Sequence, residues 1–182
     1  MNIKKPIAIM VAAATIASFS FVMLPVDGQA HAAAQWSAAQ KVIQTGTKYW
    51  GAPYEFGSNR NSTRTFDCSD FTRQAFLEGA GIEIPSDSRQ QAAYVKRIGD
   101  TTTNWKKLQP GDLMFFMSYR GYKKSSYSGI SKWKQRITHV GIYIGNGKVL
   151  HTYSRESGGV RVDRIENTHW ESRFIFGGSA LK

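Results

Sequence analysis

The sequence predicts an α+β domain in which N-terminal helices pack on a C-terminal antiparallel sheet. Two observations predict this class. Up to about residue 95 the apolar residues recur at helical spacing, whereas after residue 112 they alternate with polar residues or form short runs between turns. Helical patterns therefore come first along the chain and extended patterns later, which is typical of α+β domains.

Three helices are expected in the first half of the chain. The first covers residues 36–49, and a Gly-Ala-Pro sequence follows it. The second begins at Cys68 and ends at residues 79–81, where two glycines stand. The third covers residues 89–95, behind an N-cap offered by residues 86–88.

Five strands are expected in the second half, after a turn centred on Pro110-Gly111. The first strand is a continuous apolar run, and those that follow are mostly alternating. They cover residues 113–117, 138–144, 148–153, 160–165 and 173–176. The helix that begins at Cys68 is expected to pack on this sheet.

Residues 118–137 form an unusually long connection between two of these strands. The segment contains six Lys or Arg residues with four Tyr or Trp residues among them. A connection of this length in a compact domain is usually functional or mobile. Basic charge interleaved with aromatic rings suits a polyanionic or sugar-rich partner, and a solvated disordered loop is the alternative.

Residues 1–32 have the pattern of a secretory signal peptide. Two lysines precede a long apolar run, and the Ala-His-Ala of residues 30–32 fits the small-x-small pattern of a cleavage site. Cleavage is expected after Ala32, with Ala34 as the other choice, which leaves residues 33–182 as one exported domain. The alternative is an uncleaved membrane anchor, because the run nearly reaches the roughly 20 residues of a spanning helix.

The chain is strongly basic, with a formal net charge of +11, or +10 once residues 1–32 are lost. An exported protein with this charge is attracted to polyanions, so the basic surface is expected to bind anionic cell-wall polymers. A surface tuned for solubility is the alternative. Nucleic acid is not an expected partner, because the chain is exported and shows no nucleic-acid-binding motif. A monomer without membrane contact is expected after cleavage.

Cys68 is the single cysteine of the 182 residues. Exported proteins normally use cysteines in pairs, so a lone one indicates an intermolecular bridge or a reactive thiol. At the start of a helix, the unpaired backbone N–H groups and the helix dipole favour an anion and are expected to lower the thiol pKa. This position favours a nucleophile over a small buried apolar residue.

A cysteine nucleophile needs a base, and the base needs a group that orients it. His31 is lost with the signal peptide, and His169 lies in a polar stretch and is expected to be a surface or packing residue. His139 and His151 remain, on either side of Gly145-Asn146-Gly147. With a three-residue turn, the two histidines lie diagonally on one face of a hairpin, with α-carbons roughly 7–8 Å apart.

In that register Gly141 stands opposite His151 and leaves room between the two rings. His139 would then be the base and His151 the orienting group. A two-residue turn would place the rings on opposite faces, and two unrelated sheet histidines are the alternative. Zinc would need a third ligand, for which Asp163 is conceivable, but the chain has no His-Glu-x-x-His motif, so neither a metal nor another cofactor is expected.

Five blocks in order resemble the NlpC-type (NlpC/P60) family of bacterial cell-wall cysteine peptidases. The match runs from about residue 35 to residue 176. The blocks are residues 51–57, 66–69, 84–85 with 88–91, 108–116 and 138–147, and His151 follows them.

The resemblance implies a papain-like α+β fold with a Cys-His-polar triad formed by Cys68, His139 and His151. Tyr54 matches a tyrosine that lines the site and helps to hold the substrate or the oxyanion. Asp67 matches the acidic residue that orders the start of the cysteine helix, and Ser69 follows the cysteine as the family pattern expects.

Three features depart from the family pattern. Asp70 and Ser58 both stand where glycine is usual, and residues 118–137 are longer than the usual link. These departures affect the expected substrate more than the expected reaction.

The resemblance implies a secreted cysteine endopeptidase that hydrolyses peptidoglycan stem peptides, most often at the bond from D-γ-glutamate to a diamino acid. The alternatives are a poly-γ-glutamate hydrolase, a cysteine amidase or acyltransferase of related fold, and a non-catalytic wall-binding module. In the expected mechanism backbone N–H groups at the Cys68 helix start stabilise the oxyanion. Because His139 must be neutral when water attacks, a rising limb of activity is expected around pH 6–7.

Overall fold

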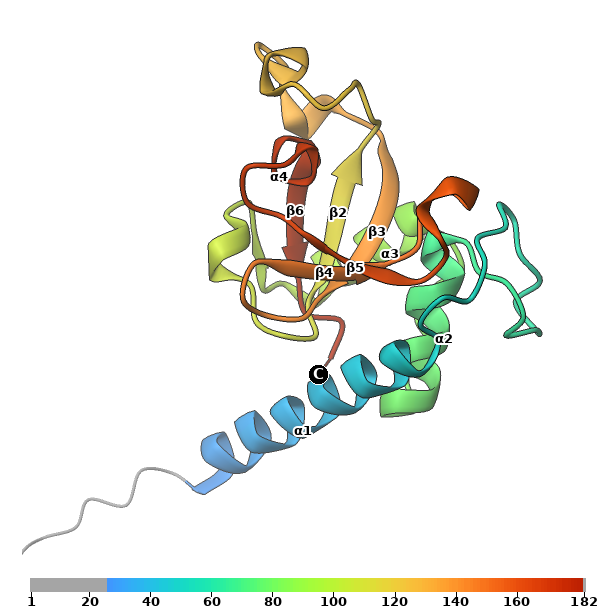
Figure 1. Ribbon diagram of the computed structural model, residues 1–182. Helices are drawn as coiled ribbons and strands as arrows, with labels where there is room; N and C mark the ends of the chain where they lie inside the picture. Colours follow the sequence, from blue (N-terminus) through green and yellow to red (C-terminus); the bar gives the residue numbers. More distant parts are fainter. Residues whose placement is uncertain (1–25, 182) are drawn as a thin grey trace, which may run out of the picture.

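The computed structural model describes residues 26–181 and confirms the α+β class (Figure 1). Most of the expected signal peptide lies outside the described residues. The helices are α1 (Val26–Lys48), α2 (Cys68–Ala80), α3 (Ser88–Ile98) and α4 (His169–Arg173). Short 3₁₀ turns are η1 (Trp105–Lys107), η2 (Lys124–Tyr127), η3 (Lys132–Lys134) and η4 (Arg155–Ser157).

Six strands form one antiparallel sheet in the order β1-β6-β2-β3-β4-β5. They are β1 (Thr101–Thr102), β2 (Leu113–Met117), β3 (Ile137–Tyr143), β4 (Lys148–His151), β5 (Arg161–Arg164) and β6 (Phe174–Gly178). The five expected strands are therefore present, and the additional strand β1 has only two residues, too few to show a pattern.

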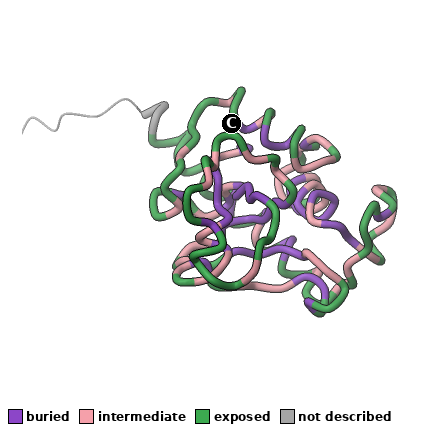
Figure 2. Tube along the Cα trace, turned by 90° about the horizontal axis from the view of Figure 1, so that it is seen from above, coloured by how far each residue is buried: buried purple, intermediate pink, exposed green. Residues whose placement is uncertain are grey.

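The central strand β2 is buried on both faces, which explains its continuous apolar sequence. Leu113, Phe115 and Met117 belong to a core cluster that includes the helices α2 and α3. Met114 and Phe116 belong to a second cluster on the other face, with aromatic side chains of the C-terminal region. Figure 2 shows the buried residues gathered inside the molecule, with exposed loops around them.

Helix α1 begins about ten residues before the expected helix, at Val26. Its first part is rich in alanine, which favours a helix even though residues 29–37 are exposed. The helix runs through the expected cleavage point at Ala32, and the cleavage itself stays a prediction. Among residues 26–181, no helix is long and apolar enough to span a bilayer.

Helices α1 and α2 pack closely because of a glycine inside α2. A Cβ atom on Gly79 would lie 2.6 Å from the Cα of Val42 in α1, so no other residue fits without separating the helices. The helix ends two residues later at Gly81, whose left-handed backbone (φ 69°) lets its N–H donate to the Leu77 carbonyl at 3.0 Å. The expected end of α2 at residues 79–81 is confirmed.

The segment between β2 and β3 is folded rather than extended into solvent. It contains the turns η2 and η3, and Tyr127 is buried in it. The Tyr127 hydroxyl donates to the Gly121 carbonyl at 3.0 Å and accepts from the Arg120 N–H at 2.9 Å. This internal packing argues against the disordered-loop alternative.

Residues 169–173 form α4, although Arg173 was expected to begin the last strand. The Thr168 hydroxyl caps this helix by accepting from the Trp170 N–H at 3.2 Å. Strand β6 therefore begins at Phe174, and Arg173 takes a position beside the site.

Candidate active site

Asp67 fixes the start of α2 so that Cys68 is its first residue, as predicted. The Asp67 Oδ1 atom accepts the backbone N–H of Ser69 at 3.0 Å and of Asp70 at 2.9 Å. The Ser69 hydroxyl also donates to this carboxylate at 2.9 Å. Two of the N–H groups expected to hold an oxyanion are therefore occupied, and the N–H of Cys68 itself has no partner among the described residues.

Cys68 is partly exposed and free, and the surrounding protein does not favour its anion. Burial raises the pKa of the Cys68 thiol to about 12, and the charge of Asp67 adds to this effect. Hydrogen bonds from backbone groups of Val140, Ser69 and Cys68 lower the pKa but do not outweigh burial. The prediction that the helix start lowers the thiol pKa is therefore wrong, because desolvation is the larger effect.

The two sheet histidines meet as the three-residue turn predicted. Strand β3 pairs with β4 through Ile142 opposite Leu150, so Gly141 stands opposite His151. Both rings are buried, and Nε2 of His139 lies 3.0 Å from Nδ1 of His151. A Cβ atom on Gly141 would lie 3.0 Å from the Cβ of His151 and 2.6 Å from Cγ2 of Val149, so the glycine keeps the space that the rings need.

Asp163, a half-buried residue of β5, is a third member of this chain of contacts. Its Oδ2 atom lies 3.2 Å from Nε2 of His151, and its Oδ1 atom accepts from Nε of Arg161 at 2.8 Å. Burial raises the pKa of Asp163, but the hydrogen bond and charge of His151 and the charge of Arg161 outweigh it and bring the pKa to about 2. The carboxylate is therefore ionised and accepts a hydrogen bond from the Nε2–H group of His151.

This chain of contacts fixes the tautomer of His139. Since His151 donates through Nε2 to Asp163, its Nδ1 accepts, and His139 must donate through Nε2. The lone pair of His139 is then on Nδ1, the ring nitrogen that is not engaged with His151. Sequence reasoning considered Asp163 only as a metal ligand, because its contact with His151 depends on the register of a third strand.

His139 is neutral in the resting site. Burial lowers its pKa well below the ordinary value of an imidazole, and the nearby His151 and Arg173 charges lower it further. Burial also lowers the pKa of His151, although Asp163 opposes this shift. The expected activity limb at pH 6–7 is therefore corrected to a lower pH.

Cys68 lies between two cavities that share Tyr54, Cys68 and Thr138. The first, of about 360 Å³, also contains Arg60, Arg89 and Arg136 in its wall. The second, of about 450 Å³, contains His139 with aromatic side chains and Arg173. We call them the basic cavity and the histidine cavity. Cys68 and His139 thus both line the histidine cavity.

Tyr54 stands beside the cysteine in both cavities, as the family resemblance implies. An isolated bridge between Tyr54 and Phe66 fixes its backbone next to the start of α2. Burial and the nearby Cys68 and Asp67 raise the pKa of its hydroxyl, which stays protonated at neutral pH. The hydroxyl has no hydrogen-bond partner among the described residues and is free to donate.

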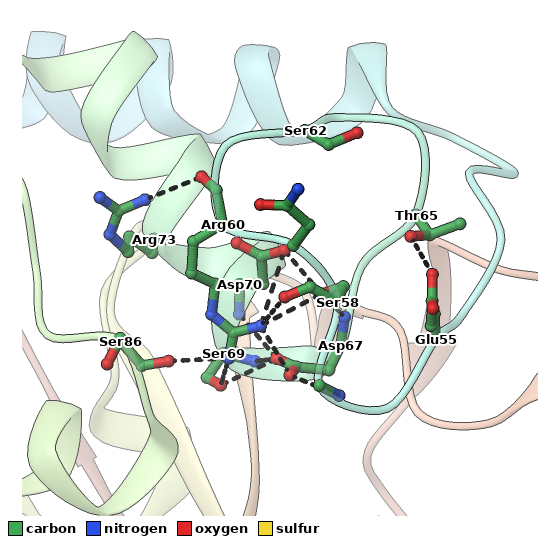
Figure 3. Close-up of polar contacts among 12 residues, drawn as sticks. Glu55, Ser58, Arg60, Ser62, Thr65, Asp67, Ser69, Asp70, Arg73 and Ser86 are labelled. Carbon is green, nitrogen blue, oxygen red and sulfur yellow. Dashed lines mark hydrogen bonds and ion pairs between the residues drawn. The ribbon is translucent and has the colours of Figure 1, made fainter.

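A polar network around the Arg60 guanidinium holds the residues at the start of α2 (Figure 3). The Arg60 guanidinium lies 2.8 Å from Asp67 Oδ2, and it donates to the Ser86 carbonyl at 3.0 Å. The two unusual residues, Ser58 and Asp70, are partners in this network, since the Ser58 hydroxyl donates to Asp70 Oδ2 at 2.6 Å. Sequence reasoning missed Arg60 because it comes from a loop without a pattern.

His169 is more than the surface or packing residue that its polar neighbours suggested. Its ring packs on Trp170 with centroids 4.6 Å apart, but it also lines the histidine cavity with Tyr119 and Tyr122. Burial lowers the pKa of His169 to about 4, so the ring is neutral there. Among the residues that the structure describes, no three His, Cys, Asp or Glu side chains gather as a metal would require.

A cysteine at a helix start, a buried histidine pair on an antiparallel sheet and helices packed beside it define an α+β domain of the papain-like class. A comparison of the sequence with known protein families agrees with this architecture. Residues 51–178 match the NlpC/P60 family, and the chain belongs to that family.

The most informative relatives are bacterial proteins much longer than the matched region. A probable endopeptidase p60 of Listeria innocua is 34% identical over 136 residues, which are 75% of this chain and 23% of that protein. Peptidoglycan DL-endopeptidase CwlO of Bacillus licheniformis is 33% identical over 143 residues, 76% of this chain and 27% of the relative. The chain thus spans about a quarter of the length of these two relatives.

Solved structures show the same fold. An NlpC/P60 family protein from Bacillus cereus superposes with a TM-score of 0.61 at 29% identity, covering 79% of this chain and 40% of that one. The NlpC/p60 domain of the peptidoglycan hydrolase SagA gives a TM-score of 0.56 at 25% identity, covering 78% and 97%.

Proposed function

We propose that this chain is a secreted cysteine endopeptidase that hydrolyses peptidoglycan stem peptides at the bond from D-γ-glutamate to the diamino acid. Cys68 is the nucleophile, His139 the base and His151 the residue that orients the base. The observation that carries the proposal is the buried contact of 3.0 Å between the two histidines, one of which, His139, lines the same cavity as the single cysteine.

The activities for which relatives are named support the substrate class. CwlO is a peptidoglycan DL-endopeptidase, and CwlT of Bacillus subtilis, 30% identical over 136 residues, is a bifunctional muramidase and DL-endopeptidase. Family membership and the net charge of +11 support action at an anionic cell wall, where the basic surface would hold the enzyme.

The first half of the reaction forms a thioester. Cys68 and His139 are both uncharged at rest, so His139 Nδ1 removes the thiol proton as the sulfur attacks the amide carbonyl carbon. The Cys68 N–H and the Tyr54 hydroxyl donate to the oxygen that becomes negative. The tetrahedral intermediate then expels the amine, which takes the proton from His139 Nδ1.

The second half releases the acyl group. His139 Nδ1, neutral again, accepts a proton from water while the water oxygen attacks the thioester carbonyl. The intermediate collapses with loss of the Cys68 sulfur, and the proton on His139 returns to it. Ionised Asp163 holds His151, and through it His139, in the tautomer that both halves require.

The basic cavity suits the acyl side of such a substrate. A D-glutamyl residue linked through its γ-carboxyl keeps a free α-carboxylate. Arg89 and Arg136 line this cavity, as Cys68 does, and Asp87 lies 3.7 Å from Arg89. Arginine recognises carboxylates through paired donors.

A digest of purified peptidoglycan with the purified protein tests the proposal. Mass spectrometry should find new fragments that end in D-γ-glutamate and others that begin with the diamino acid, and the Cys68→Ala protein should release none. Cleavage at a different amide would indicate an amidase of related fold. Binding without any cleavage would indicate a wall-binding module, and either result would overturn the proposal.

A second candidate is hydrolysis of γ-linked polyglutamate. It is favoured by a 28% identical relative, the gamma-DL-glutamyl hydrolase of Bacillus subtilis, and by the arginines of the basic cavity. Incubation with poly-γ-glutamate separates the candidates, because the first predicts that this polymer keeps its length while peptidoglycan is cut.

A further inference from the structure

We propose that the histidine cavity holds the leaving residue of the substrate and that Arg173 binds a carboxylate of that residue. This inference rests on the proposed function. That proposal assigns a cavity to the acyl side of the scissile bond, and the inference assigns one to the leaving-group side. It assigns a binding role to the cavity formed partly by residues 118–137.

The proton transfer determines which cavity holds which part of the substrate. The leaving amine takes its proton from His139, so the leaving residue must lie next to that ring. His139 lines the second cavity and is absent from the wall of the first. The acyl part therefore occupies the basic cavity and the leaving residue the histidine cavity, whose 450 Å³ is in the range of ligand sites, about 300–1,000 Å³.

Arg173 places a nearly buried positive charge in the wall of this cavity. Its residue is only 7% exposed, and its guanidinium lies over the Trp170 ring at 4.5 Å. Its Nε donates to the Met117 carbonyl at 2.9 Å, yet it forms no ion pair with any acidic side chain among residues 26–181. A nearly buried cation without an anionic partner is unfavourable, and a carboxylate from the substrate would compensate it.

The remaining wall suits the other groups of a diamino acid. Tyr119 and Tyr122 stand in it and pack against His169, with ring centroids 5.0 and 5.4 Å from that ring. Aromatic faces accept an aliphatic chain and an ammonium group. Glu156, the one carboxylate in the wall, supplies a charge for that ammonium. The cavity thus presents a cation and an anion to a residue that carries both.

The carboxylate has two chemical sources, the main chain or the side chain of the leaving residue. Three peptides of the form L-Ala-γ-D-Glu-X distinguish them. X is lysine amide, which has no carboxylate, free lysine, which has one on the main chain, or meso-diaminopimelate α-amide, which has one on the side chain. The wild type should cleave one of the acids with a kcat/KM about 10- to 100-fold above that of lysine amide.

Arg173→Gln should reduce this ratio to about one while it still cleaves lysine amide, because only the carboxylate contact is lost. A general loss of packing would lower all three rates together and leave the ratio intact. Arg120→Gln is the matched control, since it removes the same charge from an exposed residue of segment 118–137 that lines neither cavity.

The outcomes distinguish a failure of the role of Arg173 from a failure of the proposed scissile bond. Equal wild-type rates on all three peptides would overturn the role of Arg173 while leaving the proposed bond intact, and this result needs no variant to fold. A ratio that survives in Arg173→Gln, or in the neutral variant Arg173→Met if the first variant does not fold, would overturn it too. Cleavage of none of the peptides would overturn the proposed bond and the inference with it.

Discussion

His139 Nε2 lies 3.0 Å from His151 Nδ1, and this contact connects His139 on β3 through His151 on β4 to the Asp163 carboxylate on β5. In simpler triads a single amide or carboxylate contacts the histidine and orients it. Here the His151 imidazole contacts His139, and His151 is itself held by the Asp163 carboxylate. The contact is buried, so its geometry is set by the hairpin and not by solvent.

Asp163→Asn should lower kcat about 10- to 100-fold with little change in KM, because the amide no longer fixes the tautomer of His151. Steady-state kinetics on the stem peptide measure this effect. Asp112→Asn is the control, since it neutralises a half-buried carboxylate outside both cavities at the site. Equal kcat values for wild type and Asp163→Asn would show that the carboxylate plays no part in orienting the histidines.

Asp163 should also affect stability in acid. Its folded pKa of about 2 lies below the ordinary value of 3.8, so the carboxylate stabilises the fold above that value and loses the effect as pH falls toward 2. Thermal unfolding from pH 6 to pH 2 should therefore show a steeper loss for wild type than for Asp163→Asn. Parallel curves would contradict the contacts assigned to this carboxylate.

Activity should stay constant through neutral pH and fall only in acid, below pH 6.5. Burial lowers the pKa of His139 well below that value, and protonating it removes the base. Burial also raises the pKa of the Cys68 thiol to about 12, so iodoacetamide should react slowly with the resting enzyme at pH 7. If the alkylation of Cys68 is rapid, and its rate stays constant as the pH falls below 7, the resting site holds a stable thiolate–imidazolium pair and this prediction is wrong.

Asp70→Asn should raise the melting temperature at pH 7 more than at pH 4. Burial raises the pKa of Asp70, although Ser58 and Arg60 oppose the shift. A group with a raised folded pKa contributes its stability below the unfolded value of 3.8 and loses it as pH rises through the folded pKa. If the variant is instead less stable at pH 7, the attraction between Arg60 and the Asp70 carboxylate outweighs desolvation.

Gly141→Ala should lower both stability and activity. The new methyl group would meet Val149 and the Cβ of His151, and overpacking of this kind costs about 1–3 kcal/mol. Chemical denaturation measures the first effect and peptide cleavage the second. Full activity in a stable Gly141→Ala protein would show that the rings do not need the space opposite this position.

Local patterns predicted the parts of the site that depend on one element or one turn. The position of Cys68 follows from the apolar stripe of the helix behind it, and the His139–His151 pairing follows from alternation and a three-residue turn. Both predictions were confirmed by the backbone. The same reasoning predicted the helices α2 and α3 and most of the sheet.

The parts that were missed depend on contacts between distant segments. Asp163 reaches His151 only through the register of β5, and Arg173 reaches the cavity because a helix of five residues replaces the expected start of a strand. The thiol pKa was wrong because a sequence shows that a helix begins but not how deeply its first residue is buried.

The most direct test of the central claim compares wild type with Cys68→Ala and His139→Ala in cleavage of L-Ala-γ-D-Glu-L-Lys. The wild type should cleave the peptide, and each variant should have a kcat lower by about a thousandfold or more, since nucleophile and base act as one unit. Turnover near the wild-type rate by either folded variant would contradict the claim.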